Sequence, residues 1–125
     1  MTVILVVEDE TATLDLLGRS LSKAGYEITG APDGKTALNL LANSRPDMLL
    51  LDLMLPDISG MDILKHVMAQ PNPPPVVIFS ARGDASDIEA AISAGAYKYL
   101  VKPVSRDKLL ETIRSALSPR PKSQT

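Results

Sequence analysis

The chain has 125 residues, of which 45% are hydrophobic and 22% charged, and its formal net charge is −2. This length and composition fit one globular domain with a core of its own. The absence of cysteine excludes disulfide bonds and thiolate metal sites, and the acidic balance disfavours a nucleic-acid-binding surface. No apolar run is long enough to cross a bilayer and no signal peptide precedes the first run, so we expect a cytoplasmic domain.

Short apolar runs alternate along the chain with longer segments of helical periodicity. The runs predict strands at Ile4–Val7, Tyr26–Ala31, Met48–Leu53, Val76–Phe79 and Tyr97–Val101. The first, third and fourth are almost continuously apolar, as expected for strands that are buried on both faces of a sheet. The mixed polarity of the second run indicates an edge strand.

Two helices are expected between the first and third strands. The first should end at Gly25, and Asp33-Gly34 precedes the second. In both segments apolar residues recur three and four positions apart, which is typical of a helix with one buried side. These apolar positions are Leu14, Leu17, Leu21 and Ala24 in the first helix and Ala37, Leu38 and Leu41 in the second.

Three further helices are expected after the third strand. Gly60 precedes one of them, Ser86-Asp87-Ile88-Glu89 forms a capping box for the next, which should end at Gly95, and Ser105 would cap the last. Pro71-Asn72-Pro73-Pro74-Pro75 predicts a stiff loop rather than a domain boundary, because a strand resumes directly after it. The apolar positions are Met61, Leu64 and Val67 in the third helix and Leu109, Leu110, Ile113 and Leu117 in the fifth.

Five strand–helix units in succession predict an α/β fold with a doubly wound parallel sheet. Helices should cover both faces of that sheet, because right-handed crossovers place them there. Residues 1–118 would form this single domain, and residues 119–125 would be a polar tail or the beginning of a linker.

Polar side chains stand at the ends of four predicted strands. Glu8 and Asp9 follow the first strand, Asp52 lies at the end of the third, Ser80 follows the fourth and Lys102 follows the fifth. In open α/β sheets ligands bind outside the carboxyl ends of the strands, at the point where the strand order reverses. We therefore expect these five side chains to converge at one edge of the sheet.

Three carboxylates and one ammonium at that edge would leave an excess of negative charge. Carboxylates at close range disfavour each other's ionised form, so such a cluster binds either protons or a cation. Mg²⁺ would neutralise the excess, and it prefers a few hard oxygen ligands and often bridges to a phosphate. The pattern therefore indicates metal-assisted phosphoryl chemistry.

Four motifs occupy these strand ends. They are Glu8-Asp9 after Ile4–Val7, Leu51–Pro56 with Gly60, Phe79-Ser80-Ala81, and Tyr99–Pro103. Each alone is weak, but together and in this order they resemble response regulator receiver domains over residues 3–117. The resemblance implies the flavodoxin-like strand order 2-1-3-4-5 and a cis peptide bond between Lys102 and Pro103.

The resemblance also implies which residues carry the chemistry. Asp52 matches the aspartate that accepts the phosphoryl group. Asp9 and Asp52 match carboxylate ligands of Mg²⁺, the backbone carbonyl of Met54 would be a third ligand, and Glu8 would act through a metal-bound water.

The remaining matches concern the response to phosphorylation. Ser80 and Lys102 match the hydroxyl and the lysine that bind the new phosphoryl group, and Tyr99 matches an aromatic residue that then rotates inward. Met54 and Arg82 stand where the family tunes hydrolysis of the aspartyl phosphate. Neither side chain readily orients a water molecule, so we expect slow autodephosphorylation.

The implied function is a phosphorylation-dependent signalling switch. A sensor histidine kinase or a phosphotransfer protein would donate the phosphoryl group, and the fourth helix, fifth strand and fifth helix would change to control a downstream protein or a linked output domain. We expect no enzymatic activity beyond the chain's own phosphoryl transfer, and no binding to nucleic acid or membranes. A weak homodimer through the output face is left open. That face has mixed charge from Lys98, Arg106, Asp107, Lys108, Glu111 and Arg114.

Parts of the pattern would also fit other functions. A phosphatase of the haloacid dehalogenase type needs a second aspartate two residues after the nucleophile, where this chain has Met54. A pseudo-receiver that binds a partner without phosphorylation is the alternative that we keep. Glu8-Asp9 alone would also suit a helix N-terminus, and Tyr99 alone could be an ordinary half-buried tyrosine. His66, the single histidine, receives no role.

Overall fold

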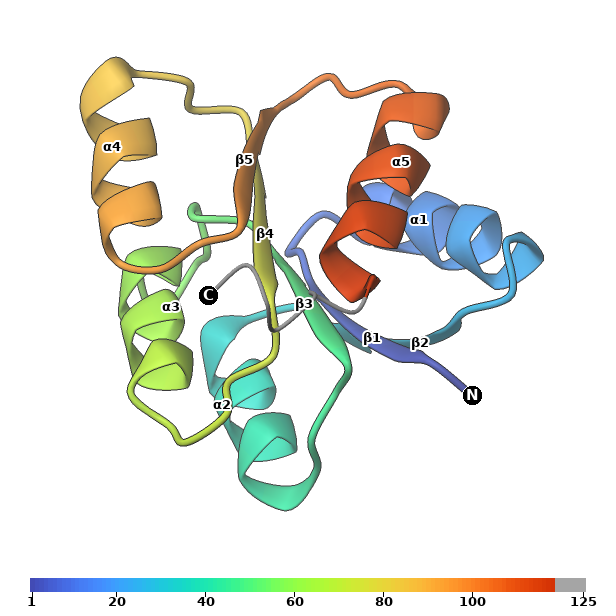
Figure 1. Ribbon diagram of the computed structural model, residues 1–125, viewed down its shortest axis with the longest axis horizontal. Helices are drawn as coiled ribbons and strands as arrows, with labels where there is room; N and C mark the ends of the chain where they lie inside the picture. The colour runs from blue at the N-terminus through green and yellow to red at the C-terminus, as the bar shows by residue number, and fades with distance from the viewer. Residues whose placement is uncertain (119–125) are drawn as a thin grey trace, which may run out of the picture.

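The computed structural model describes residues 1–118, in which five strands and five helices alternate (Figure 1). The predicted tail, residues 119–125, lies outside the described part of the chain. Among residues 1–118, no helix combines the length and the apolar character needed to span a membrane. The elements are β1 (Val3–Val7), α1 (Thr11–Lys23), β2 (Glu27–Ala31), α2 (Gly34–Asn43), β3 (Met48–Leu51), α3 (Gly60–Met68), β4 (Val76–Ser80), α4 (Ala85–Ser93), β5 (Lys98–Val101) and α5 (Arg106–Leu117).

The strands form one parallel sheet in the order β2-β1-β3-β4-β5, which confirms the expected topology. β2 lies at an edge, as its mixed polarity predicted. The order reverses at β1, which pairs with β2 on one side and with β3 on the other. Val7 is paired with Leu51, so the carboxyl ends of β1 and β3 lie next to each other. The residues that follow these two strands therefore meet at the switch point of the sheet.

Each face of the sheet carries its own hydrophobic core. In Figure 1, α1 and α5 cover one face and α2, α3 and α4 cover the other. Successive residues of a strand point to opposite faces, so Leu5 packs toward α2–α4 while Ile4 and Val6 pack toward α1 and α5. Burying a side chain of this size contributes about 1.5–3 kcal/mol, which explains why continuous apolar runs form the central strands.

Several helix ends are as predicted. Gly25 and Gly95 have φ angles of +98° and +110° and follow the C-cap residues of α1 and α4, a conformation that suits glycine. Ser105 caps α5 by accepting a hydrogen bond from the backbone N–H of Lys108 at 3.1 Å. Leu117 at the end of α5 is only partly buried, but it packs against the core as expected.

The predicted capping box of α4 is wrong. The helix begins at Ala85, with Asp84 as the N-cap residue, and the Asp84 side chain makes no capping hydrogen bond. Ser86 therefore lies inside the first turn. At the end of α1, Ala24 is an exposed C-cap residue and does not belong to the buried face of that helix.

The third strand ends earlier than the apolar run suggested. β3 stops at Leu51, because the chain then turns out of the sheet. The backbone N–H of Met54 donates to Oδ1 of Asp52 at 2.9 Å, and the N–H of Gly60 donates to the carbonyl of Leu53 at 2.9 Å. Leu53 is buried, but it lies in this turn and not in the strand.

Candidate functional site

The predicted site residues lie at the carboxyl ends of β1, β3, β4 and β5. Backbone hydrogen bonds to neighbouring strands hold them there. The N–H of Asp52 donates to the carbonyl of Val7 at 3.1 Å, and the N–H of Lys102 donates to the carbonyl of Ser80 at 2.8 Å. The Lys102-Pro103 peptide bond is cis, as the family resemblance implied. The sheet itself thus sets the spacing between side chains that are far apart in the sequence.

Lys102 bridges two buried carboxylates. Its Nζ lies 2.5 Å from Oε1 of Glu8 and 2.8 Å from Oδ2 of Asp52. The exposed fractions of these side chains are 21% for the lysine, 2% for the glutamate and 6% for the aspartate. The ammonium also lies 4.8 Å from the centre of the Phe79 ring, at a distance typical of a cation–π contact. Charge-assisted hydrogen bonds of this kind are stronger than neutral ones and fix the positions of both partners.

Burial and ion pairing have opposite effects on the pKa values of Glu8 and Lys102. Burial raises the pKa of Glu8, and the hydrogen bond from Lys102 opposes that rise without cancelling it. Burial by itself would lower the pKa of Lys102, but its hydrogen bonds to Asp52 and Glu8 outweigh this effect and raise the pKa. Lys102 therefore stays protonated at neutral pH and keeps a positive charge beside Asp52.

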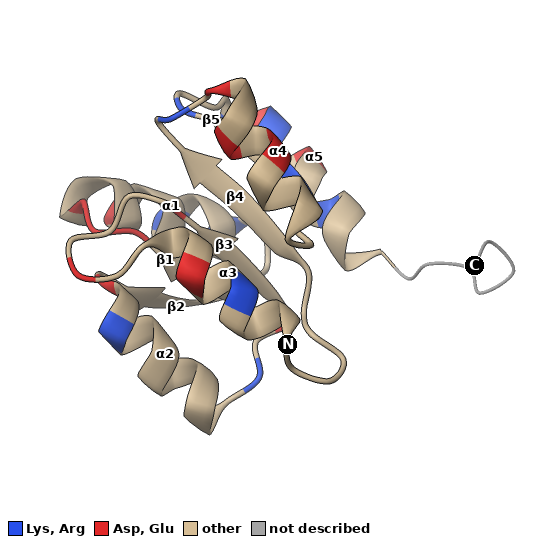
Figure 2. Cartoon of the chain, turned by 90° about the vertical axis from the view of Figure 1, so that its left-hand side faces the viewer, with Lys and Arg blue, Asp and Glu red and all other residues tan. Residues whose placement is uncertain are grey.

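Three carboxylates gather at the same place. Oxygen atoms of Glu8, Asp9 and Asp52 all lie within 4.8 Å of one another, and only the Asp9 side chain is exposed. Figure 2 shows acidic residues in the loops beside the start of α1. With Lys102 the group has a formal excess of two negative charges, which one divalent cation would neutralise. Hard oxygen donors and this charge fit Mg²⁺.

Met54 follows the cluster in the β3–α3 loop. The residue is 51% exposed, and its N–H donates to Oδ1 of Asp52. The two oxygens of Asp52 therefore have different partners, because Oδ1 accepts from this backbone N–H and Oδ2 accepts from Lys102.

Ser80, Arg82 and Tyr99 form a second group next to the cluster. Ser80 is fully buried at the end of β4, and its Oγ accepts from the N–H of Arg82 at 3.3 Å. The Tyr99 hydroxyl donates to the carbonyl of Arg82. Burial raises the pKa of Tyr99, and the negative charge of Asp87 adds to this effect.

Arg82 has a role that the sequence analysis missed. Its side-chain Nε lies 3.1 Å from Oδ2 of Asp87 in α4, while its backbone bonds to Ser80 and Tyr99. Arg82 therefore links the end of β4 and Tyr99 of β5 to α4. The only sequence signal was an acidic residue five positions later, and such spacing alone does not predict a contact.

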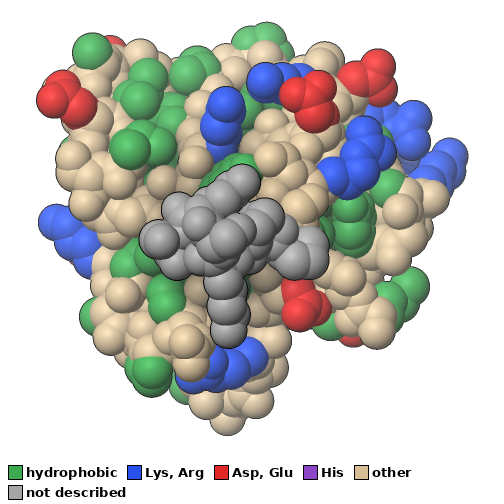
Figure 3. All heavy atoms as spheres, viewed as in Figure 1, with side chains coloured by type: hydrophobic (Ala, Val, Ile, Leu, Met, Phe, Trp, Pro, Cys, Tyr) green, Lys and Arg blue, Asp and Glu red, His purple; other side chains and the backbone are tan. Residues whose placement is uncertain are grey.

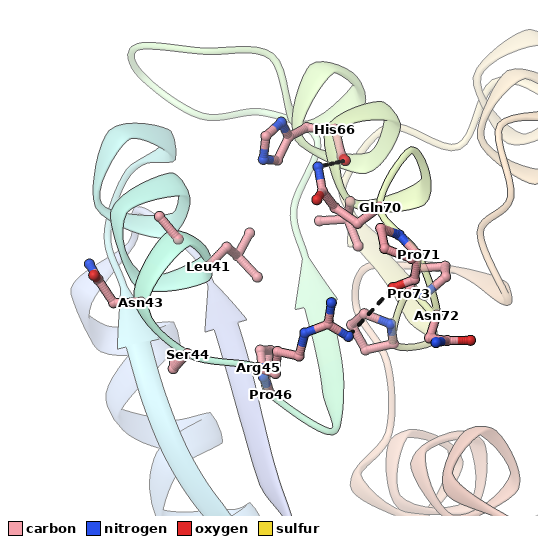
Figure 4. Close-up of a pocket in the computed structure, with 13 residues that line it drawn as sticks. Leu41, Asn43, Ser44, Arg45, Pro46, His66, Gln70, Pro71, Asn72 and Pro73 are labelled. Carbon is pink, nitrogen blue, oxygen red and sulfur yellow. Dashed lines mark hydrogen bonds between the residues drawn. The ribbon is translucent and has the colours of Figure 1, made fainter.

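A surface pocket of about 550 Å³ lies at the opposite end of the sheet (Figure 4). It is formed by the segments that lead into β3 and β4, and Leu41, Arg45 and His66 are among its lining residues. In Figure 4 the Arg45 guanidinium points toward Pro71, whose carbonyl it contacts at 3.4 Å. None of the predicted site residues lines this pocket. The chemistry suggested by the sequence therefore belongs to the carboxyl-terminal edge of the sheet.

A parallel sheet of order 2-1-3-4-5 with an acidic cluster and a lysine at the carboxyl ends of its strands is the arrangement expected of a receiver domain. The chain belongs to the response regulator receiver domain family, whose pattern it matches over residues 4–114. Among curated relatives, response regulator MprA of Mycobacterium sp. (strain KMS) is 40% identical over 114 residues, which cover 91% of this chain and 50% of that protein. MprA of Mycobacterium avium (strain 104) is 39% identical over the same length. The chain thus spans about half the length of these relatives.

Solved structures show the same fold. A CheY-like response regulator receiver domain protein from Methanospirillum hungatei JF-1 superimposes with a TM-score of 0.90 at 29% identity, covering 94% of both chains. A putative response regulator from Chloroflexus aurantiacus J-10-fl gives a TM-score of 0.88 at 32% identity, covering 94% of this chain and 98% of that one. These findings confirm the family and the fold that the motifs suggested.

Proposed function

We propose that this chain is a phosphorylation-dependent switch in which Asp52 accepts a phosphoryl group from a phosphohistidine. The observation that carries the proposal is the Lys102 ammonium 2.8 Å from a buried Asp52 carboxylate at the switch point of the sheet. A carboxylate can act as a nucleophile when neighbouring groups orient it. Here the N–H of Met54 and the ammonium of Lys102 hold its two oxygens in place.

The transfer forms one bond and breaks another. An oxygen of Asp52 attacks phosphorus, a P–O bond forms, and the P–N bond to the donor histidine breaks, which leaves an acyl phosphate. The charge of Lys102 then pairs with phosphoryl oxygens. Positioned positive charge of this kind stabilises phosphoryl transfer without any change of covalent structure in the lysine.

The acidic cluster would hold Mg²⁺ during this reaction. Asp9, Asp52 and the backbone carbonyl of Met54 are the proposed ligands, and Glu8 acts through a bound water. When bound, Mg²⁺ supplies positive charge that compensates the phosphoryl oxygens. Glu8 also keeps Lys102 in place, because its carboxylate lies 2.5 Å from the ammonium.

Phosphorylation would change the surface through Ser80 and Tyr99. The Ser80 hydroxyl accepts from Arg82 in this structure, and a phosphoryl group on Asp52 would draw it away to donate to a phosphoryl oxygen. That movement releases the N–H of Arg82, whose carbonyl holds Tyr99. Contacts that differ between two states in this way bias the equilibrium between them.

The proposed output face consists of α4, β5 and α5. Ile92 in α4 and Val101 in β5 are 46% and 42% exposed, which is high for aliphatic side chains. Basic and acidic side chains lie together over α5 in Figure 3. A mixed apolar and charged surface suits a protein partner, either a downstream protein or a linked output domain.

The proposed phosphoryl donor is a sensor histidine kinase or a phosphotransfer protein, and we place the reaction in the cytoplasm. The chain would itself become phosphorylated in each transfer. It would not act as an enzyme that releases a product from a separate substrate. A pseudo-receiver that works without phosphorylation is the alternative, and the following experiment separates the two.

Intact-mass measurement after incubation with phosphoramidate tests the proposal. We expect a gain of about 80 Da, one phosphoryl group, that requires Mg²⁺ and disappears in Asp52→Asn. Acetyl phosphate serves as a second donor. A wild-type protein that gains no mass with either donor would contradict the proposal and favour the pseudo-receiver.

The lifetime of the acyl phosphate provides a separate prediction. The double variant Met54→Asn, Arg82→Glu should lose the phosphoryl group at least about tenfold faster, because an amide and a carboxylate can orient an attacking water. The Arg82 change also breaks the ion pair with Asp87, so Asp87→Asn is the matched control. Equal decay rates in the wild type and the double variant would show that these two positions do not limit hydrolysis.

A further inference from the structure

We propose that Asp57 is a positioning residue of the phosphoacceptor site. Its carboxylate ties the loop after Asp52 to the N-terminus of α2, and this link holds the loop in the shape that binds Mg²⁺. The inference rests on the proposed function for the position of the metal site, and it gives helix α2 a part in that site.

The Asp57 carboxylate accepts three hydrogen bonds, of which two cross to α2 and one comes from the next residue of its own loop. Oδ1 of Asp57 accepts from the N–H of Gly34 at 2.8 Å and from the N–H of Ile58 at 2.9 Å. Oδ2 accepts from the N–H of Lys35 at 2.9 Å. The bonds from the α2 backbone lower the pKa of Asp57, so the carboxyl group is ionised at neutral pH. Free N–H groups at a helix N-terminus favour such an anionic partner.

Helix α2 has its own cap besides this contact. Asp33 precedes the helix, and its side chain accepts from the N–H of Thr36 at 2.7 Å. Asp57, by contrast, reaches the helix across more than twenty residues of sequence, since it is 23 positions from Gly34. The second carboxylate is therefore a tertiary link that joins the phosphoacceptor loop to α2.

Close packing at both ends leaves this loop little freedom. A Cβ on Gly34 would lie 2.9 Å from Cβ of Ile58, and a Cβ on Gly60 would lie 2.4 Å from the carbonyl oxygen of Asp52. Met54, the proposed source of a backbone metal ligand, lies between these anchored ends. Removing the anchor at Asp57 would let the Met54 carbonyl sample other positions, so that binding Mg²⁺ would first have to order the loop.

The test compares Asp57→Ala with Asp33→Ala. Each variant removes one carboxylate from the N-terminus of α2, but only the first releases the loop. Isothermal titration with Mg²⁺ should show a dissociation constant about tenfold higher for Asp57→Ala, the scale seen when residues that orient metal ligands are removed. Asp33→Ala should stay within about twofold of the wild type. Asp57→Asn should recover part of the loss, because its amide oxygen can still accept from the α2 backbone.

The free energy of unfolding, measured for the same variants, separates a role of Asp57 in positioning the loop from a role in overall stability. Equal loss of Mg²⁺ affinity in the two alanine variants, or no loss in Asp57→Ala, would overturn the inference. The titration does not depend on phosphorylation, so it still tests the role of Asp57 if the wild type binds Mg²⁺ but gains no phosphoryl mass. That last result would contradict the proposed function alone, whereas a wild type that binds no Mg²⁺ would overturn both.

Discussion

Replacing Lys102 by methionine is expected to reduce phosphorylation by phosphoramidate at least about a hundredfold and to destabilise the fold. The variant would leave Glu8 and Asp52 buried without their ammonium partner. Removing one member of a buried ion pair costs about 3–5 kcal/mol, and we expect about 2–3 kcal/mol here because the lysine is 21% exposed. Intact mass and urea-induced unfolding at neutral pH measure the two effects.

The stability loss in Lys102→Met should depend on pH. Burial already raises the pKa of Glu8 above its ordinary value of 4.5, and loss of the ammonium would raise it further. A carboxyl group whose pKa is higher in the folded state favours folding below its unfolded pKa, and this contribution disappears as the pH rises through the folded pKa. The difference from the wild type should therefore be small near pH 4.5 and grow toward pH 7.

Added Mg²⁺ should partly restore the stability of Lys102→Met, because a bound cation would compensate the negative charge of the carboxylates in place of the missing ammonium. The midpoint of unfolding should rise more with added Mg²⁺ in Lys102→Met than in the wild type. Lys108→Met is the matched control. Its Nζ is 4.0 Å from Glu111 on the surface, so we expect a change of less than about 0.5 kcal/mol. A Lys102 variant as stable as this control at pH 7 would contradict the buried-pair argument.

Replacing Gly60 by alanine should have a comparably large effect for a steric reason. The new Cβ would lie 2.4 Å from the carbonyl oxygen of Asp52 and 2.5 Å from Cα of Leu53. Both are backbone atoms that directly follow β3, so the backbone at Asp52 would have to move. We expect a loss of about 3 kcal/mol or more in the free energy of unfolding, with little phosphorylation of the folded remainder.

Gly18→Ala tests whether the loss of stability in Gly60→Ala comes from that position or from the change of glycine to alanine in itself. Gly18 lies inside α1, and a Cβ there would meet nothing within 4 Å. Alanine has a higher helix propensity than glycine, so this variant should be more stable by about 0.5–1 kcal/mol. The same chemical change thus has opposite expected signs at the two positions. A Gly60→Ala protein with wild-type stability would contradict the steric argument, because it would show that the backbone after β3 can shift to make room for the new Cβ.

The strands and the site edge were predictable because their signals are local. Burial on both faces requires a continuous apolar run, as in Met48–Leu51, and a half-polar run indicates the edge strand β2. Parallel strands bring their carboxyl ends to one edge, so Asp52 and Lys102 could be placed near each other before their distance was known. The positive φ angles of Gly25 and Gly95 likewise match a requirement of the local backbone.

The features that the sequence did not predict depend on how the elements pack. Asp84 takes the N-cap position of α4 although Ser86 had the better local pattern, and the pairing of Arg82 with Asp87 depends on how α4 sits beside β5. The contact of Asp57 with α2 gave no signal, because Gly34 and Lys35, which donate these two hydrogen bonds, begin a helix that starts 23 residues earlier. Side-chain bonds of this kind form only after the elements have packed.

The sequence by itself determined the (βα)5 order, the family and the identity of the charged residues at the strand ends, because hydrophobic periodicity and short motifs are properties of neighbouring residues. Only the tertiary structure decided that Lys102 joins Glu8 to Asp52, that Arg82 connects Ser80 and Tyr99 to α4, and that Asp57 is hydrogen-bonded to the backbone of α2. The physical reason is that a hydrogen bond requires its two atoms to lie about 3 Å apart. Sequence spacing does not supply that distance, whether the partners lie in separate strand–helix units, as Lys102 and Asp52 do, or only five residues apart, as Arg82 and Asp87 are.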